Sequence, residues 1–294
     1  MGAILVAAAI LWPAAVAGAQ APIVAGAGDI ACAPSGLVTA TTCRQMKTSD
    51  LFVANPAIKA VLALGDEQYE TGALADFQAA YAHSWGRALA KTHPVPGNHE
   101  YAGGSNGAGY FAYFGARAGD PTKGWYSFNV GQWHLIALNG NCTHIAGGCG
   151  ASSDQMTWLE SDLAAHHPAC TLAYWHQSRF SSGPQGNLAA YDAIWKALYS
   201  HHVDVVLGGH DHDYERFALQ TPAQVPDPQH GIREFVVGTG GDSLDPFVGA
   251  FTNGQFRQNT QFGVLKLTLH PRWYEWRFVN TAKHVLDSGQ TNCH

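Results

Sequence analysis

Basic residues are scarce in this chain. Lys and Arg total 16 of 294 residues against 22 Asp and Glu, which gives a formal net charge of −6, and no run of basic residues occurs. Nucleic acids and anionic membranes are bound by strongly basic surfaces. The sequence therefore predicts no nucleic-acid-binding footprint, and a small anion that is captured locally is the more fitting partner.

A long uninterrupted apolar run is also missing. The Ala-rich segment from Met1 to about Ala21 is short for a comfortable membrane span and ends in Ala17-Gly18-Ala19, which fits a small-x-small cleavage site. We predict that residues 1–21 are a signal peptide and that the mature chain, residues 22–294, has no stable membrane span and is secreted or periplasmic. Because the segment begins without Lys or Arg, a short uncleaved anchor is the alternative.

No CxxC pair occurs among the 6 cysteines, which argues against cysteine-ligated zinc. An even number of cysteines in an exported chain indicates disulfides, although six cysteines allow fifteen full pairings. Local spacing suggests Cys32 with Cys43, and Cys142 and Cys149 flank a Gly-rich loop. The remaining pair, Cys170 with Cys293, would tie the tail to the core.

Neither an internal repeat nor an interdomain linker interrupts the chain, which at 46% apolar residues can bury the core of a single domain. Short apolar runs alternate with helical patterns, which predicts an α/β fold. The predicted strands are Ile23–Ala27, Ala60–Leu64, His93–Pro96, Thr171–Trp175, Val203–Leu207 and Phe235–Val237. Two predicted antiparallel pairs, Trp125–Val130 with Trp133–Leu138 and Phe262–Leu269 with Trp273–Val279, make the sheets mixed.

Helical patterns cover four segments: Cys43–Ala54, Ala73–Trp85, Ser153–His166 and Leu188–His201. Ser152, followed three residues later by Gln155, predicts a capping box at the start of the third. Thr221–His230, rich in Pro and Gln, is predicted to be a surface loop that rims the active site.

Polar residues follow five of the six strands, at Asp29, Asp66, Asn98, His176 and His210. Because the carboxyl ends of parallel strands share one edge of a sheet, these side chains are expected to converge. Oxygen and imidazole donors suit iron, zinc or manganese better than calcium. The sequence thus predicts a transition-metal centre.

The order of the motifs resembles that of the calcineurin-like metallophosphoesterases, and specifically their purple acid phosphatase branch. The matching blocks are Asp29-Ile30-Ala31, Gly65-Asp66-Glu67-Gln68-Tyr69, Gly97-Asn98-His99-Glu100, His176 and Gly209-His210-Asp211-His212. The broader superfamily has a histidine where this chain has Ala31, and Tyr69 replaces that ligand in the tyrosine-bearing branch. The resemblance implies two stacked mixed β-sheets flanked by helices, a four-layer sandwich.

The resemblance also implies two metal ions. Asp29, Asp66, Tyr69 and His212 would bind Fe(III), and Asp66 would bridge to a divalent zinc, iron or manganese ion that Asn98, His176 and His210 complete. Asp29, Asp66 and a tyrosinate together contribute about −3, which suits a trivalent ion beside a divalent one.

Three residues are candidates for substrate contact. His99 resembles the family's outer histidine, which contacts the phosphate and assists charge neutralisation, so it is the predicted catalytic residue, with proton transfer as a further role. Asn98 and Arg179 are predicted to contact a substrate oxygen, the latter through its guanidinium. Plant members of this branch carry a histidine pair about ten residues after the ligand histidine, whereas His176–Asn187 contains no second histidine. The donor of a proton to the leaving group therefore stays unassigned.

The resulting hypothesis is a secreted, metal-dependent acid phosphatase in which a metal-bound hydroxide attacks phosphorus in line. Its substrate would be a small phosphomonoester. A phosphodiesterase with the same metal core is the first alternative, and the shape of the loops at Gly103–Gly109, Cys142–Cys149 and Thr221–His230 would decide between them. A non-catalytic binding scaffold of the same fold is the second. The oligomeric state does not follow from the sequence.

Overall fold

The structure, a computed structural model, describes residues 20–294. The predicted signal peptide falls almost entirely on residues 1–19 and so lies outside the described residues. None of the helices in residues 20–294 combines the length and the apolar character that a membrane span requires.

One sheet has six strands in the order β13-β12-β11-β1-β2-β3. Its parallel half pairs β1 with β2 and β2 with β3, and its antiparallel half is the meander β11–β12–β13, joined through β11 to β1. The strands are β1 (Ile23–Ala27), β2 (Ile58–Ala63), β3 (Thr92–Pro94), β11 (Gly263–Leu269), β12 (Trp273–Asn280) and β13 (Val285–Asn292).

The other sheet has seven strands in the order β10-β8-β9-β7-β6-β5-β4. Its centre, β5–β6–β7–β9, is parallel, and β4, β8 and β10 pair antiparallel at the two edges. The strands are β4 (Tyr126–Val130), β5 (Trp133–Ala137), β6 (Cys170–Gln177), β7 (Val205–Gly209), β8 (Tyr214–Phe217), β9 (Arg233–Val237) and β10 (Gly254–Gln258).

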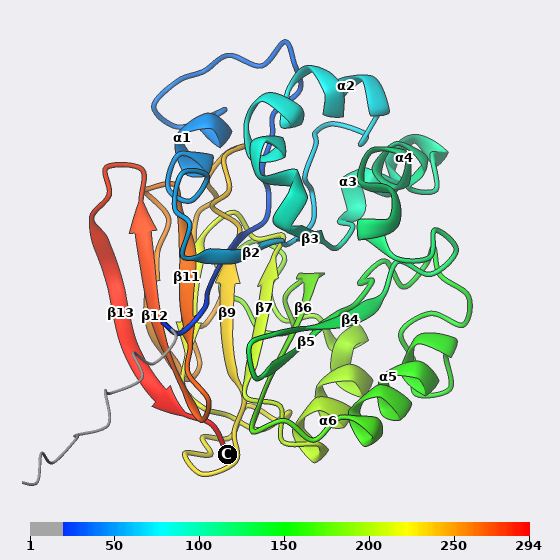
Figure 1. Cartoon of the computed structure of the whole chain (residues 1–294), viewed down its shortest axis with the longest axis vertical. Coiled ribbons are helices and arrows are strands. Elements are labelled where there is room, and N and C mark those ends of the chain that lie inside the picture. The colour runs from blue at the N-terminus through cyan, green and yellow to red at the C-terminus, as the bar shows by residue number, and fades with distance from the viewer. Residues whose placement is uncertain (1–19) are drawn as a thin grey trace, which may run out of the picture.

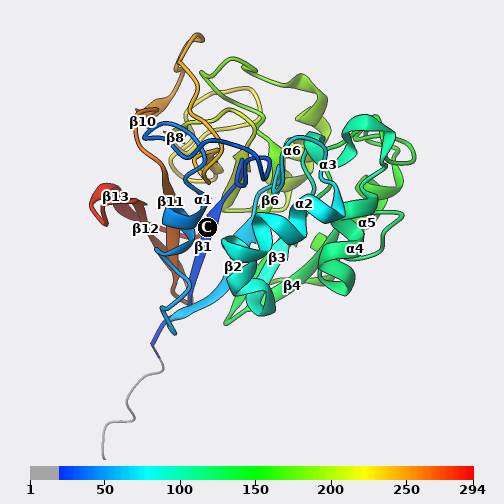
Figure 2. The same cartoon turned by 90° about the horizontal axis from the view of Figure 1, so that it is seen from above.

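Short helices connect the strands (Figure 1). The α-helices are α1 (Gln45–Ser49), α2 (Leu74–Ala79), α3 (Asn98–Tyr101), α4 (Ala108–Phe114), α5 (Asp154–Ala165) and α6 (Asp192–Ser200). The 3₁₀ segments are η1 (Tyr81–His83), η2 (Trp85–Lys91), η3 (Ala102–Gly104), η4 (Gly115–Ala118) and η5 (Ala189–Tyr191). In the view from above, α2, α3 and α4 gather on the side of β2 and β3, and β11–β13 lie on the opposite side (Figure 2).

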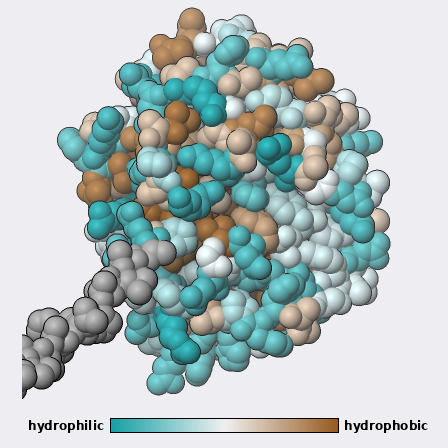
Figure 3. All heavy atoms as spheres, in the orientation of Figure 1, coloured by the Kyte–Doolittle hydropathy of each residue, from teal (hydrophilic) through white to brown (hydrophobic). Residues whose placement is uncertain are grey.

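Two apolar clusters hold these layers together. The larger one joins the facing sides of the two sheets, with Leu62 and Leu265 from one sheet and Leu172 and Phe235 from the other, all buried. The smaller one packs α5 and α6 onto the outer face of the seven-stranded sheet. Hydrophobic residues on the molecular face in Figure 3 occur in small groups among hydrophilic ones. The predicted α/β architecture of two mixed sheets flanked by helices is confirmed.

The predicted strands and both antiparallel pairs are present, and β1 has the predicted bounds. The helical predictions are too long, since Cys43–Ala54 contains only α1, and Ala73–Trp85 divides into α2 and 3₁₀ turns. The strand β13 was missed because its sequence, VLDSGQTN, has few apolar residues. It forms because the neighbouring edge of β12 offers backbone partners from Trp273 to Val279, with one register shift after Phe278.

The predicted capping box at Ser152 is wrong. Ser153 caps α5, and its side chain accepts a hydrogen bond from the backbone N–H of Met156. Gln155 instead reaches the β5 exit, where it accepts from the backbone N–H of Asn139 and donates to the carbonyl of the same residue. The side chain of Gln155 thus bonds the buried backbone of Asn139 and does not cap its own helix.

The three suggested disulfides are all present: Cys32–Cys43, Cys142–Cys149 and Cys170–Cys293. The last one spans 123 residues and fastens the end of β13 to the start of β6. Long closures of this kind restrict the unfolded chain most. The C-terminal end of the described chain is therefore held against the seven-stranded sheet.

A buried histidine–carboxylate contact lies away from the strand exits. His134 in β5, 2% exposed, contacts Asp162 of α5 through Nε2 at 2.7 Å, and Asn129 Oδ1 lies 2.9 Å from its Nδ1. The exposed ring of His166 stacks on His134 at 4.1 Å between ring centroids. Burial acts to raise the pKa of Asp162, but hydrogen bonds from His134 and Ser127 outweigh it and hold the pKa below its ordinary value.

We expect Asp162→Asn to lower the free energy of unfolding by about 2 kcal/mol at neutral pH, because charged hydrogen bonds to His134 and Ser127 are lost. A carboxylate with a lowered pKa contributes stability above its unfolded pKa of about 4 and loses it as the pH falls through the folded value. Urea unfolding from pH 7 to pH 3 should thus show a difference from wild type that shrinks below about pH 4. Glu160→Gln, on the exposed face of the same helix, is the control; a difference that grows toward low pH would contradict the interpretation.

Candidate metal centre

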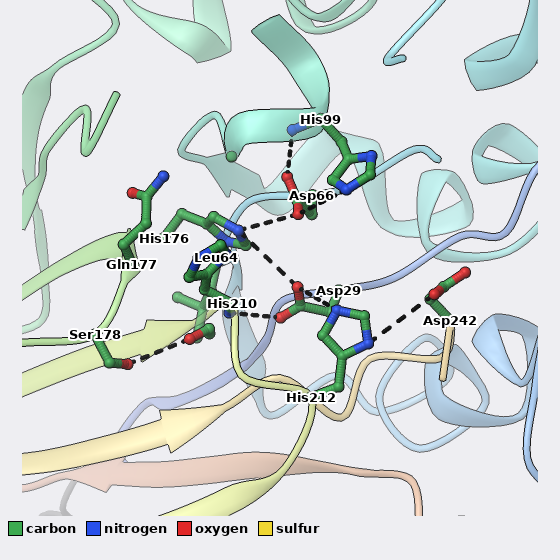
Figure 4. Close-up of polar contacts among 12 residues, drawn as sticks. Asp29, Leu64, Asp66, His99, His176, Gln177, Ser178, His210, His212 and Asp242 are labelled. Carbon is green, nitrogen blue, oxygen red and sulfur yellow. Dashed lines mark hydrogen bonds and ion pairs between the residues drawn. The ribbon is translucent and has the colours of Figure 1, made fainter. Parts of the chain in front are cut away.

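The five predicted strand exits meet at one edge of the molecule. Asp29 follows β1, Asp66 follows β2, and Asn98 follows β3 as the first residue of α3. His176 lies at the end of β6 and His210 directly follows β7. The six-stranded and seven-stranded sheets thus both contribute, since the carboxyl ends of their parallel strands face the same space (Figure 4).

Three of these exits have a left-handed backbone. The φ angles are 59° at Asp29, 47° at Asp66 and 74° at His210. Such angles are uncommon for residues other than glycine and cost free energy unless the surrounding structure holds them. Each sharp turn directs a polar side chain back across the end of its strand, so local strain accompanies the convergence.

The carboxylates of Asp29 and Asp66 form the middle of the cluster and are 0% and 1% exposed. The hydroxyl of Tyr69 lies 3.0 Å from Asp29 Oδ1 and 3.2 Å from Asp66 Oδ2. His176 Nε2 lies 3.1 Å from Asp66 Oδ2 and 4.0 Å from Asp29 Oδ1, and His212 Nε2 lies 3.2 Å from Asp29 Oδ1. One compact group therefore includes both acids, the phenol and two imidazoles.

The imidazoles of His176 and His212 are each oriented by a hydrogen-bond acceptor on the side away from the carboxylates. His176 Nδ1 lies 2.8 Å from the carbonyl oxygen of Leu64, and His212 Nδ1 lies 2.8 Å from Ser243 Oγ. An Nδ1–H that donates to such an acceptor leaves Nε2 with its lone pair, which is the usual arrangement of a metal-bound histidine. Both Nε2 atoms point toward the carboxylates (Figure 4).

The ionised carboxylates of Asp29 and Asp66 are stable in this buried site only with positive charge beside them. Burial acts to raise the pKa of Asp66, but the imidazole of His176 outweighs it and holds the pKa well below the ordinary value. In return, although burial acts to lower the pKa of both histidines, Asp66 raises that of His176 to about 9 and Asp29 raises that of His212 to about 10. Carboxylates that raise the pKa of buried histidines favour positive charge beside them. The site therefore suits bound cations.

Tyr69 and Asn98 fit the same interpretation. Burial raises the pKa of Tyr69 well above its ordinary value, and the carboxylates of Asp29 and Asp66 raise it further, so its phenolate requires a strong cation. Asn98 Oδ1 is buried without a hydrogen-bond partner in residues 20–294. Donor atoms of Asp66, His176 and His210 lie within 4.8 Å of one another. The donors present therefore fit transition-metal ions.

His99 lies at the open side of the group. Its backbone N–H donates to Asp66 Oδ1 at 2.8 Å, and its Nδ1 lies 2.6 Å from the carbonyl oxygen of Glu70. The ring packs against that of Tyr69, at 4.3 Å between centroids, and the side chain is 29% exposed. His99 Nε2 is thus the nitrogen that faces the cluster, 3.9 Å from Asp66 Oδ2.

Arg179 does not extend toward this group. Its Nε donates to Asp192 at 2.6 Å and its guanidinium lies over the ring of Phe180. The predicted substrate contact of Arg179 therefore has no support in its position, because its charge is engaged by Asp192.

The loop Thr221–His230 lies elsewhere than predicted. It follows β8, which runs away from the cluster, and its Asp227 accepts a hydrogen bond from Tyr199 near the end of α6. The expectation that this loop rims the site is wrong, because the antiparallel direction of β8 places it at the opposite edge of the sheet. The Cys142–Cys149 loop does lie near the site, since Asn141 just before it donates to the carbonyl of Pro96.

Two residues that support the centre had no predicted role: Glu100, which stands in the block Gly97-Asn98-His99-Glu100, and Ser243. Glu100 accepts hydrogen bonds from the backbone N–H groups of Asp66, Gln68 and Gly97, which joins the β2 and β3 exits. Ser243, on the loop after β9, orients His212. The sequence feature that could have indicated Ser243 is the Gly-rich run after Val237. This run follows the sixth predicted strand and carries no candidate ligand of its own.

This arrangement, with oxygen and imidazole donors at the shared edge of two sheets, is of the metallohydrolase kind. The family model of the calcineurin-like phosphoesterases matches residues 41–214. The chain belongs to this family, as the motif order predicted. The match includes the β2, β3, β6 and β7 exits, whereas Asp29 precedes it.

Relatives agree with the predicted branch. Purple acid phosphatase 15 of Arabidopsis thaliana is 31% identical over 150 residues, which covers 45% of this chain and 27% of the relative. The chain thus spans less than a third of that relative. Purple acid phosphatase PPD1 of yellow lupin superposes with a TM-score of 0.80 at 20% identity, over 93% of this chain and 54% of that one. GAP50, described as the anchor in the inner membrane complex of Plasmodium, has a TM-score of 0.65 at 14% identity, over 94% of this chain and 90% of its own.

Gly97 packs so closely against the β2 exit that a Cβ there would overlap the backbone nitrogen and carboxylate of Asp66. Its φ of −94° and ψ of −173° suit alanine, so only the overlap matters. We expect Gly97→Ala to displace Asp66 and to weaken metal binding about 10- to 100-fold, as changes around metal ligands do.

Metal content after dialysis against graded chelator concentrations would measure this effect. Gly150→Ala is the matched control, because a Cβ at Gly150 meets nothing within 4 Å. Equal metal retention in Gly97→Ala and Gly150→Ala, with both chains folded by circular dichroism, would contradict the prediction.

Proposed function

We propose that this protein hydrolyses phosphoesters at a dinuclear metal centre and that small phosphomonoesters are its favoured substrates. The observation that carries the proposal is the convergence of Asp29, Asp66 and Tyr69 with His176 and His212 into one buried group. Family membership supports the reaction class. The relatives named purple acid phosphatases support the acid phosphatase branch.

The donor set divides into two metal positions. Asp29, Asp66, Tyr69 and His212 would hold Fe(III), and Asp66, Asn98, His176 and His210 would hold a divalent zinc, iron or manganese ion. Burial and the imidazole of His176 lower the pKa of His210 to about 4, so His210 offers a neutral nitrogen. The anionic donors thus gather at the first position and the neutral donors at the second, which supports a trivalent ion beside a divalent one.

Two bound ions would supply an activated water nucleophile and neutralise the charge that develops on the phosphoryl group. Residues of the chain would bind and orient the substrate. His99, at the open side, would contact a phosphate oxygen through Nε2, because its Nδ1 is engaged by the carbonyl of Glu70. The ring of Tyr69 packs against this histidine and the backbone N–H of His99 donates to Asp66, and both contacts fix its position.

The proposal extends to the processing of the chain. Three disulfides are consistent with an oxidising compartment. We propose that residues 1–21 direct export, that residues 22–294 form the catalytic domain, and that the enzyme acts outside the cytoplasm.

A tyrosinate bound to Fe(III) absorbs visible light by charge transfer, so the purified protein is expected to be coloured. Tyr69→Phe should abolish the band because the phenolate donor is lost. Visible absorption spectra together with iron analysis would test this. An iron-loaded wild-type protein that has no such band, or a band that survives in Tyr69→Phe, would refute the tyrosinate assignment.

Asn98→Ala should lower the turnover of a chromogenic phosphomonoester about 100-fold and release the divalent ion first, because it removes a neutral donor from the second position. Asn292→Ala, an exposed asparagine near the end of β13, is the matched control. Steady-state rates with a monoester and a diester at several pH values would measure both the effect and the substrate preference.

The outcomes separate the alternatives. A higher kcat/KM for the diester would favour the phosphodiesterase. A wild-type protein that retains no metal and hydrolyses neither ester would favour the binding scaffold.

A further inference from the structure

Three histidines gather at the edge of the molecule opposite to the proposed metal centre. They are His202 after α6, His230 in the loop after β8 and His294 after β13. Asp204, which contacts His294, directly precedes β7, whereas His210 directly follows that strand. The 5 residues of β7 lie between Asp204 and His210, and this length of strand places the two ends about 20 Å apart, so this group is independent of the first one.

The three rings surround a common point. Their centroids are 6.0 Å apart for His202 and His230, 6.0 Å for His202 and His294, and 6.2 Å for His230 and His294. The rings are steeply inclined to one another, at 59°, 86° and 71°. This near-equilateral arrangement differs from the stack of His134 and His166, whose ring centroids lie 4.1 Å apart at an interplanar angle of 16°.

A point equidistant from the three centroids lies about 3.5 Å from each, and a zinc ion bound at a Zn–N distance of about 2 Å lies roughly 3 Å from the centre of an imidazole ring. The ring centres thus lie near the distance that one ion requires, and rotation of the exposed side chains of His202 and His230 would turn their nitrogens toward it.

The surroundings of His294 already suit a metal ligand. Its Nδ1 lies 3.3 Å from Asp204 Oδ1, and its backbone N–H donates to the same oxygen at 3.0 Å. Its Nε2 is buried and has no hydrogen-bond partner in residues 20–294. A carboxylate behind one nitrogen with the other nitrogen free is the pattern found around metal-bound histidines. The disulfide at Cys293 fixes the adjoining backbone.

The backbone of His202 gives a second indication. His202 has a φ of 57° at the end of α6, a left-handed position that glycine usually occupies. Its backbone N–H donates to the carbonyl of Tyr199. Placement of an imidazole at such a position costs conformational free energy, and strain of this kind is concentrated at functional sites.

We propose that His202, His230 and His294 form a further site for a divalent transition-metal ion, with zinc or copper the best match for three neutral imidazoles. The ion would link the end of α6, the loop Thr221–His230 and the end of β13. Asp227 adds negative charge nearby: it accepts the backbone N–H groups of Gln229 and His230. Its carboxylate favours a cation over an anion at this edge.

Copper(II) is the probe for the test, because imidazole nitrogens split its electron paramagnetic resonance spectrum. The purified protein, with its first centre loaded, would be titrated with copper(II) and its bound copper counted by elemental analysis. His202→Ala and His230→Ala remove one exposed donor each. His284→Ala is the matched control, an exposed histidine at the opposite end of β13.

Wild type and His284→Ala are expected to bind one more copper ion per chain than either His202→Ala or His230→Ala, with nitrogen splitting only where the extra ion is present. Phosphomonoester turnover should be the same in all four proteins, which separates this site from the proposed catalytic centre. Equal copper uptake in all four proteins, or a copper signal without nitrogen splitting, would overturn the proposal.

Discussion

Two buried carboxylates dominate the structure around the strand exits. Asp29 and Asp66 leave neighbouring strands through left-handed turns and lie together without solvent. Two such charges repel each other and lose their hydration unless cations compensate them. The imidazoles of His176 and His212 are placed at hydrogen-bonding distance from them and held by acceptors on their far sides. Much of the surrounding architecture, including the close approach of Gly97, serves to hold the two acids in place.

Much of this centre was predictable because its residues follow strands. Strands of Val, Leu and Ala are recognised from short apolar runs, and the residues that follow them converge by topology. The supporting residues were harder to predict. Ser243 belongs to a loop whose course depends on the pairing of β8 with β9, and Thr221–His230 was misplaced for the same reason. Gln155 satisfies Asn139 across the fold, a contact that a local capping pattern does not show.

The fold by itself does not separate an enzyme from a scaffold. A structure described as a membrane-complex anchor shares the fold of this chain, as does a plant purple acid phosphatase. The distinction therefore depends on the donors. A binding scaffold does not require acids that are both buried and held in a strained backbone, since such acids reduce stability. Here Asp29, Asp66 and His210 all have left-handed backbone conformations, and Asn98 Oδ1 is buried without a partner in the described residues.

The acids behind the centre differ from Asp29 and Asp66 in the direction of their pKa shifts. Burial raises the pKa of Glu67 well above its ordinary value, and the repulsion of Glu100 raises it further. Burial and the charge of Asp66 raise the pKa of Glu100 to about 7. Neither side chain is paired with an imidazole in the described chain, whereas Asp29 and Asp66 are. The imidazoles of His176 and His212 thus outweigh burial and hold the pKa of Asp66 and Asp29 below the ordinary value, whereas burial raises that of Glu67 and Glu100, so negative charge is most favoured where the strand exits meet.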